Sequence, residues 1–229
     1  MQTADIANAP PDLRAALRHA TAELHRHLDR APDQGALLAP DITLGRYATI
    51  MEKHLHALAI AEAALASLEH ARPSALPPYR PRLPALEADI AALAAQGHST
   101  TRPGTHVAPS AEAAPAMDGV LACGRYLGTR YVLEGSTRGA AAIAPRLDRH
   151  LPTLSANAFD FWRLQAEEAP AWHALALTLA ALPARGDLAS AAIAAARGTF
   201  VVFLRAFGLD APEPSRPHVA DVDRVGVRR

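Results

Sequence analysis

Hydrophobic residues recur every three or four positions along most of this chain, which is the spacing of amphipathic α-helices. The clearest case is the stretch over residues 13–29, whose apolar stripe consists of Leu13, Leu17, Ala20, Leu24 and Leu28. Similar patterns predict helices at residues 44–70, 84–95, 117–147, 170–182 and 188–207, with an aromatic-rich segment at 154–165. Because alanine and leucine dominate and β-branched runs are rare, the predicted fold class is all-α.

Residues with strong positional preferences mark several of the predicted helix ends. Asp12 precedes the first helix and Asp41 or Thr43 precedes the second, and short polar side chains of this kind cap helix N-termini. Gly208 follows the last helix, where a glycine commonly ends one. The segment between the first two helices, residues 31–43, is predicted to be a loop because it contains glycine and proline.

The predicted helices are expected to form a single domain over residues 12–208. Residues 1–11 end in an Ala-Pro-Pro run and are expected to be a flexible arm, and residues 209–229 are expected to be a disordered tail. The stretch at 98–115 is rich in proline, threonine and serine. We expect it to be a surface loop and not a domain boundary, because the helices on either side need each other for burial.

Composition narrows the classes of function. Of the 229 residues, 50% are hydrophobic, which suffices for a sizeable core, and 23 basic residues balance 23 acidic ones. A neutral chain has no overall field that would attract nucleic acid or an acidic membrane. Cys123 is the single cysteine, which excludes an internal disulfide and a cysteine-based zinc site. With neither an 18-residue apolar run nor a signal-like N-terminus, we expect a cytoplasmic protein without a membrane span.

A second stripe lies beside the apolar face of the first predicted helix and consists of Arg14, Arg18, Thr21 and His25. At about 100° per residue, these four side chains fall within roughly 60° of one another. Arg18 lies roughly 10.5 Å from His25 along the axis of such a helix. This spacing suits a large flat ligand that carries a metal at its centre and anionic groups at its edge. Taken alone, the pattern still favours an ordinary helix histidine, so other parts of the chain must decide.

Other histidines offer weaker candidates for metal binding. His54 and His56 are two residues apart on one predicted helix, where they diverge by about 200° and cannot share a metal. We expect both at the surface or at the rim of a core. His98 and His106 lie in the predicted loop without nearby candidate ligands.

Four glycines share one face of the predicted helix at 117–147. Relative to Gly124, ideal helix geometry places Gly128, Gly135 and Gly139 within about 60°. Together they cost roughly 3–4 kcal/mol compared with alanine, so something must approach this backbone closely. A neighbouring helix and a ligand explain the pattern equally well. Gly135 and the serine after it also form a candidate site for a kink.

These two stretches together resemble the haem oxygenase family. The sequence LRHATAELHRHLD at residues 17–29 is similar to the family's proximal-helix motif, in which a Leu-basic-x-Ala-Thr pattern precedes the iron-ligating histidine. The sequence YVLEGSTRGA at residues 131–140 is similar to the distal-helix motif of the bacterial, bacteriophytochrome-associated branch, usually YVLEGSxLGG. Trp172 and the pattern from Ala196 to Phe203 agree with the C-terminal helices. The resemblance covers about residues 12–207 and implies a single-domain, haem-oxygenase-like multi-helix bundle.

The resemblance assigns roles to particular residues of this chain. It implies that His25 is the proximal iron ligand and that the distal helix supplies the catalytic residues Gly135, Ser136 and Gly139. The residues expected to contact haem are His25, Arg18, Thr21, Tyr131, Phe200 and Phe203. Arg18 is the favoured partner for a haem propionate, since guanidinium–carboxylate pairs are strong and directional. Arg14, Arg130 and Arg163 are weaker candidates for the same role.

The implied reaction opens haem b oxidatively to biliverdin and releases CO and ferrous iron. Haem is then both substrate and cofactor, O2 is the oxidant, and electrons come from a ferredoxin or a flavoprotein reductase. A proximal histidine leaves the opposite face of the iron open for O2. A bacteriophytochrome that receives the biliverdin is a further partner implied by the likeness.

Two positions depart from the usual distal motif. Ala140 stands where the family usually has a second glycine, and Arg138 stands where leucine is common. These departures put turnover in doubt more than the fold, so a haem-binding or haem-delivery protein without turnover is the alternative function. A helical interaction module that binds no haem is a third possibility. This third possibility predicts that a His25→Ala substitution has no effect on the protein's behaviour.

Overall fold

The computed structural model describes residues 12–97, 119–154 and 156–212, which form an all-α bundle as predicted. In this part of the chain no strand forms, and one isolated bridge pairs Asp12 with Pro183. The α-helices are α1 (Leu13–Asp29), α2 (Pro32–Ala36), α3 (Leu44–Ser67), α4 (Leu83–Ala95), α5 (Gly119–Gly135), α6 (Thr137–His150), α7 (Asp160–Glu167), α8 (Ala169–Ala180) and α9 (Gly186–Ala206). Two 3-10 helices, η2 (Glu69–Ala71) and η3 (Ala156–Phe159), join them. The predicted arm at 1–11, the predicted loop at 98–115 and the predicted tail from residue 213 lie outside the described residues.

The helix ends follow local side-chain chemistry. Asp12 caps α1 by accepting a hydrogen bond from the Ala15 amide (2.7 Å), and Thr43 caps α3 by accepting one from the Arg46 amide (3.3 Å). Gly208 follows α9 with φ at +72°, a conformation that glycine adopts without strain. The predicted loop at 31–43 was wrong in part, because the short helix α2 begins there at a proline in its first turn.

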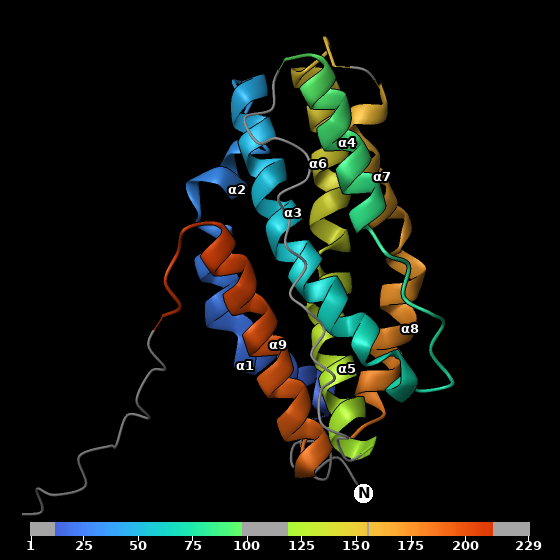
Figure 1. Cartoon of the computed structure of the whole chain (residues 1–229). Coiled ribbons are helices and arrows are strands. Elements are labelled where there is room, and N and C mark those ends of the chain that lie inside the picture. Colours follow the sequence, from blue (N-terminus) through green and yellow to red (C-terminus); the bar gives the residue numbers. More distant parts are fainter. Residues whose placement is uncertain (1–11, 98–118, 155, 213–229) are drawn as a thin grey trace, which may run out of the picture.

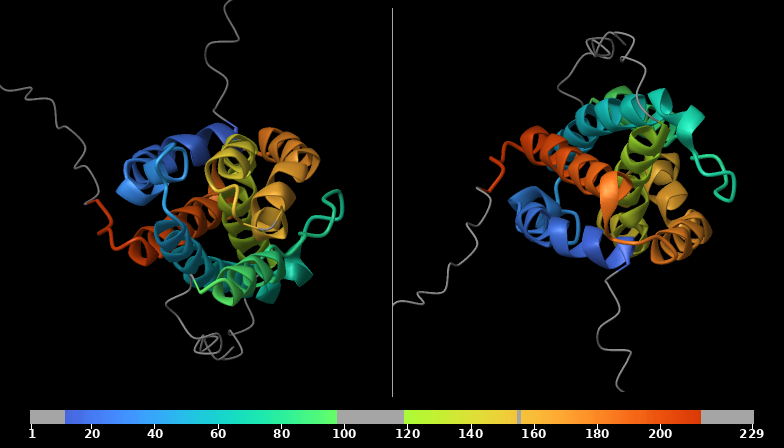
Figure 2. Two further views of the ribbon diagram at one scale, coloured as in Figure 1. Left: turned by 90° about the horizontal axis from the view of Figure 1, so that it is seen from above. Right: turned by 90° about the horizontal axis from the view of Figure 1, so that it is seen from below.

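Helices α5 and α6 follow each other along the long axis of the bundle (Figure 1). Helices α1 and α9 lie side by side on one flank, and α7 and α8 lie on the other. Viewed along the axis, α5 lies in the middle of the bundle, where it packs on α3, α8 and α9 (Figure 2). In sequence α1 and α9 stand at opposite ends of the described chain, so the bundle closes by bringing these ends together.

The predicted helix at 117–147 is two helices, and the break between them lies at Ser136. This confirms the predicted kink beside Gly135. On the α5 side of the break, the backbones of α5 and α9 touch. A Cβ atom at Gly128 would overlap the carbonyl oxygen of Ala192, and one at Gly124 would overlap that of Leu188. Half of the glycine face therefore serves helix packing.

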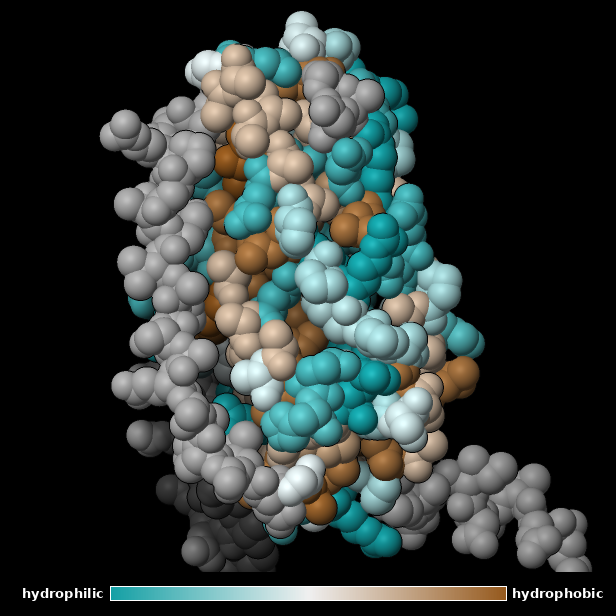
Figure 3. Space-filling view, turned by 45° about the vertical axis from the view of Figure 1, so that its right-hand side comes forward, coloured by the Kyte–Doolittle hydropathy of each residue, from teal (hydrophilic) through white to brown (hydrophobic). Residues whose placement is uncertain are grey.

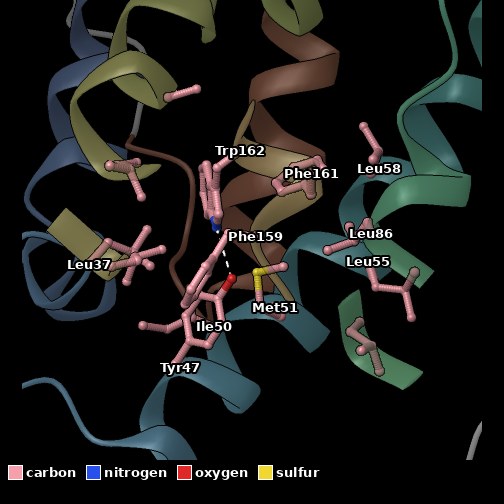
Figure 4. Packing of buried hydrophobic residues seen from close by; sticks show 14 of the residues in the cluster. Leu37, Tyr47, Ile50, Met51, Leu55, Leu58, Leu86, Phe159, Phe161 and Trp162 are labelled. Carbon is pink, nitrogen blue, oxygen red and sulfur yellow. Dashed lines mark hydrogen bonds between the residues drawn. The ribbon is translucent and has the colours of Figure 1, made fainter. Parts of the chain in front are cut away.

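The main core lies between α3, α4, α6 and α7 (Figure 4). Its aromatic centre is held by hydrogen bonds as well as by packing. Tyr47 donates its hydroxyl to the Ala158 carbonyl (3.1 Å), and the Trp162 indole donates to the Tyr47 oxygen (3.2 Å). These bonds satisfy polar atoms that would otherwise be buried alone.

The expectation for His54 was wrong, whereas His56 is exposed as expected. His54 is buried, with its ring 5.0 Å from that of Phe207, 5.2 Å from Trp162 and 6.0 Å from Phe161. Its Nδ1 lies 2.9 Å from the carbonyl oxygen of Ile50. Burial lowers the pKa of His54 to about 4, so the imidazole is neutral in the folded protein at pH 7.

Hydrophilic residues predominate on the right of the face in Figure 3, whereas hydrophobic ones gather toward its middle and left. By length and composition alone, α9 is the one described helix that passes the test for a membrane span. A core helix of a helical bundle can pass the same test, and α9 packs on α1, α3 and α5. The result is therefore weak evidence for a membrane span.

Candidate functional site

A small hydrophobic cluster joins three of the four helices that carry the predicted site. It consists of Leu24 from α1 and Phe200 and Leu204 from α9, with Val132 of α5 packed against them. The cluster is separate from the main core. It therefore fixes the C-terminal half of α1 next to the end of α5, one turn before the break in the distal motif.

His25 stands at the edge of this cluster. Its ring meets that of Phe200 edge to face, with centroids 5.7 Å apart, while its side chain remains 60% exposed. Its Nδ1 lies 2.6 Å from a carboxylate oxygen of Asp29, one turn further along α1. An ionised carboxylate only accepts hydrogen bonds, so Nδ1 carries the proton that is shared with Asp29. The other ring nitrogen, Nε2, then keeps a lone pair that suits a metal ion.

The second half of the glycine face behaves differently from the first. A Cβ atom at Gly135 would make ordinary contact with the Trp172 ring at 3.8 Å, and one at Gly139 would meet nothing within 4 Å. Gly139 is also exposed. Helices α1 and α6 both pack on α8, but α1 otherwise packs on α2 and α9, whereas α6 packs on α7 and η3. No other described segment covers the side of α6 that carries Gly139.

The two departures from the usual distal motif have different surroundings. Ala140 is 1% exposed and belongs to the main hydrophobic core. Its methyl group therefore packs inside the bundle and does not narrow the open side of α6. Arg138 belongs to α6, but its side chain lies outside the described part of the structure.

The arginines predicted on α1 lie beside Tyr131. Burial raises the pKa of the Tyr131 phenol, and the neighbouring Thr21 hydroxyl and the Arg14 and Arg18 guanidiniums oppose that shift. The Tyr131 ring is also 5.6 Å from that of Trp172. Arg14 and Arg18 are exposed, and neither forms an ion pair with a carboxylate of the described residues. Both guanidiniums are therefore available to an anionic ligand.

The sequence matches the protein-family model described as Heme oxygenase over residues 11–208. The chain belongs to the haem oxygenase family. No match was found among curated proteins. The match spans nearly all of the described helices, so it confirms the resemblance at the level of the family.

Haem fits the side chains that this family member brings together. The imidazole of His25, whose Nε2 has no partner among the described residues, could ligate an iron, a Cβ at Gly139 would meet no described atom within 4 Å, and the exposed Arg14 and Arg18 could pair with acidic groups of a ligand. Phe200 is buried and contacts the His25 ring edge to face, and Phe203 is half-buried at the margin of the main core. Thr21 is buried and donates its hydroxyl to the Leu17 carbonyl (2.8 Å).

Two of the weaker propionate candidates have partners elsewhere. Arg130 is fully buried, where it donates to Glu134 (2.8 Å), to the Tyr126 hydroxyl (2.9 Å) and to the Pro77 carbonyl (2.7 Å). It cannot reach an exposed haem edge, and in this respect the suggestion was wrong. Arg163 lies on α7 and pairs with Asp148 and Asp160.

Two features of the site were not foreseen from the sequence. Asp29 holds the His25 ring, and a His–Asp pair spaced four residues apart on one helix is a readable signal for such a contact. Arg82 reaches the break between α5 and α6, where it meets Gln165 and the predicted site residue Ser136. No local pattern points to Arg82, because its partners are 51 to 83 residues away.

Proposed function

We propose that this protein is a haem oxygenase that opens haem oxidatively to biliverdin and releases CO and ferrous iron. The observation that carries the proposal is the environment of His25: its imidazole is exposed, its Nδ1 is held by Asp29, and its Nε2 has no partner among the described residues. Histidines that ligate metal ions commonly donate their other ring N–H to a carboxylate in this way. Membership of the haem oxygenase family favours haem as the compound whose metal His25 binds.

In this proposal each element of the site has a separate task. His25 ligates the iron from the α1 side, and Phe200 supports the imidazole ring from below. Arg18, with Arg14 as a second candidate, pairs with the propionates. Bound haem supplies an iron that activates O2, and the reaction needs electrons from outside.

The distal side of the site is made of backbone and small side chains. The open turn at Gly139 would let α6 approach the ring closely, so that the shape of this backbone would select the carbon that is oxidised. Ser136 and Gly135 set the position of that turn. The first residues of α6 thus act by positioning, without supplying a strong acid or base.

The partners and location follow from the same proposal. A ferredoxin or a flavoprotein reductase delivers the electrons in the cytoplasm, and an acidic surface on that donor would be steered by the exposed arginines of α1. The bacteriophytochrome-associated branch, with a phytochrome that takes up the biliverdin, belongs to this proposal as well.

The test is an absorption titration of the purified protein with hemin, followed in the same cuvette by ascorbate in air with catalase present. We expect a saturable Soret band that bleaches to a biliverdin-like spectrum. The variant His25→Ala should lose the axial histidine signature and turnover, and imidazole in the buffer should restore part of the former. The matched control is His19→Ala, which removes another exposed histidine of the same helix.

Each outcome separates the candidate functions. A Soret band that persists under reductant and O2 would favour the haem-binding protein without turnover and direct attention to Arg138. Equal behaviour of His25→Ala and His19→Ala would show that the iron ligand is misassigned. Absence of a specific Soret band would leave the helical interaction module.

A further inference from the structure

The break between α5 and α6 leaves carbonyl groups that helix geometry no longer satisfies. The last turn of any α-helix has carbonyls without intrahelical donors, and Leu133, in the last turn of α5, is buried. Ser136 offers one donor to these carbonyls, since its hydroxyl lies 2.8 Å from the Leu133 carbonyl oxygen. The same hydroxyl also lies 2.6 Å from the Gln165 amide oxygen. A single hydroxyl proton cannot serve both acceptors at once.

Arg82 supplies the missing donors from outside the two helices. Its side chain is 2% exposed, and its Nη1 lies 2.6 Å from the Leu133 carbonyl oxygen. The same nitrogen is 3.2 Å from the Ser136 hydroxyl and 3.2 Å from the Gln165 amide oxygen. A buried cation at this point also opposes the negative end of the α5 dipole. One guanidinium thus joins the end of α5, the break and helix α7.

Arg82 is itself held by a carboxylate of α3. Glu62 accepts hydrogen bonds from the backbone amides of Arg82 (2.7 Å) and Leu83 (3.2 Å), and from the Tyr79 hydroxyl (2.9 Å). Glu62 therefore satisfies the backbone of the segment before α4 and not the guanidinium. As a result the Arg82 side chain is free to bind the break, while its backbone cannot drift away from α3.

We infer that Arg82 is a positioning residue that fixes the angle between α5 and α6, and with it the height of the Gly139 backbone over the haem site. This inference rests on the proposed function, because the position of Gly139 matters for oxidation only when haem lies beneath it. Gly139 is one turn beyond Ser136, so a small rotation of α6 at the break displaces it directly. Arg82 thereby contributes to the choice of the carbon that is oxidised without touching the ring.

The first experiment needs no haem. Amide hydrogen exchange is measured on the unliganded chain for peptides that cover residues 133–140, in wild type and in Arg82→Met. Methionine keeps the apolar length but removes every donor. We expect exchange in these peptides to rise at least tenfold. The control is the double variant Arg130→Met/Glu134→Gln, which removes a buried ion pair from α5 without leaving an unpaired charge.

The second experiment uses the hemin-loaded protein and reads geometry. The C–O stretching frequency of the ferrous CO complex and the ratio of biliverdin isomers both respond to the distance of the distal backbone. We expect Arg82→Met to bind hemin within about threefold of wild type, yet to shift or broaden the C–O band and change the isomer ratio. The control double variant should keep both wild-type values even if its melting temperature falls.

The outcomes distinguish this inference from the proposed function. Unchanged exchange, C–O band and isomer ratio in Arg82→Met would overturn the inference and leave the haem oxygenase proposal intact. Failure of wild type to bind hemin would overturn the proposed function and the haem-directed part of the inference, with hydrogen exchange still judging the break. If Arg82→Met does not fold, Arg82→Lys takes its place, because lysine keeps the charge but not the fork of donors. A wild-type isomer ratio in that variant would count against the inference.

Discussion

The role proposed for His25 depends on a second residue, Asp29, which sets the ring orientation and tautomer. We expect Asp29→Ala to weaken hemin affinity about tenfold. Loss of the group that accepts a hydrogen bond from a metal-bound histidine commonly costs about 10–100-fold in affinity or activity. Asp29→Asn should lose less, since its amide oxygen still accepts from Nδ1. Hemin titrations of the three proteins measure this order, and equal affinities would mean that Asp29 does not orient the ring.

His54 should contribute a pH-dependent part of the stability. Its pKa is about 4 in the folded protein, against an ordinary value of 6.5, so the folded state disfavours the charged ring. The contribution of neutral His54 to the free energy of unfolding is fully present above pH 6.5. It falls by about 3 kcal/mol in total as the pH is lowered toward 4. Relative to His54→Leu, wild type should therefore lose this amount between pH 6.5 and 4 in urea unfolding.

The difference between the two proteins is the informative quantity, because Asp89 acts in the opposite direction. Burial raises the pKa of Asp89 to about 7, so its contribution declines as pH rises through that value. Asp89 is common to both proteins and cancels in the comparison. A difference that stays constant with pH would show that His54 is hydrated or charged in the fold.

At the scale of elements, the two halves of the glycine face of α5 and α6 have different surroundings, which the sequence pattern cannot separate. Gly128→Ala should destabilise the protein by about 2 kcal/mol, since the overlap with the α9 backbone exceeds the gain of about 1 kcal/mol in helix propensity. Gly139→Ala should be neutral or stabilising by up to about 1 kcal/mol, because open space surrounds that position. Chemical denaturation of the hemin-free proteins measures both values.

The pair also tests the proposed site. If Gly139 faces haem, Gly139→Ala should impair hemin binding or turnover while it leaves the unliganded protein as stable as wild type. Gly198→Ala, at another exposed and open glycine on α9, is the control and should change neither property. Strong destabilisation by Gly139→Ala would place a neighbouring segment against α6.

Much of the fold was predictable because helical periodicity and capping are local. The core stripe of α1, the Asp12 cap and the break near Gly135 all follow from residues within a few positions of each other. Periodicity shows which face of a helix is covered but not what covers it. For this reason it could not tell that Gly128 meets a helix and that Gly139 does not.

The candidate site was predictable only where its residues share a helix or a family motif. The burial of Arg130 and the position of Arg82 depend on partners that the fold brings from distant segments. Charged residues are assigned to the surface by any pattern argument, and a buried guanidinium appears only when its acceptors are located in three dimensions. His54 was misplaced for the same reason.

For the whole molecule, the proposed site lies between two helices, α1 and α6, whose other neighbours are largely different. Because α8 is the one main neighbour that α1 and α6 share in the described part of the chain, a ligand between them should add contacts that the unliganded protein lacks. Hemin at 100 times its Kd should therefore stabilise the fold by about 2.7 kcal/mol and raise its Tm. Thermal unfolding with and without hemin measures this, and His25→Ala should reduce the shift.

The packing of α1 against α8 and α9 has a consequence for how the chain is made. The Leu13 amide donates to the Leu182 carbonyl, and the Arg197 side chain donates to the Ala20 carbonyl, so the main partners of the first helix lie in the last quarter of the sequence. A growing polypeptide therefore leaves most of the apolar stripe of α1 uncovered until α9 has left the ribosome. At synthesis speeds of about 5–20 residues per second, that interval lasts roughly ten seconds or longer. Truncation before α9 should yield a chain that chaperones retain and proteases remove.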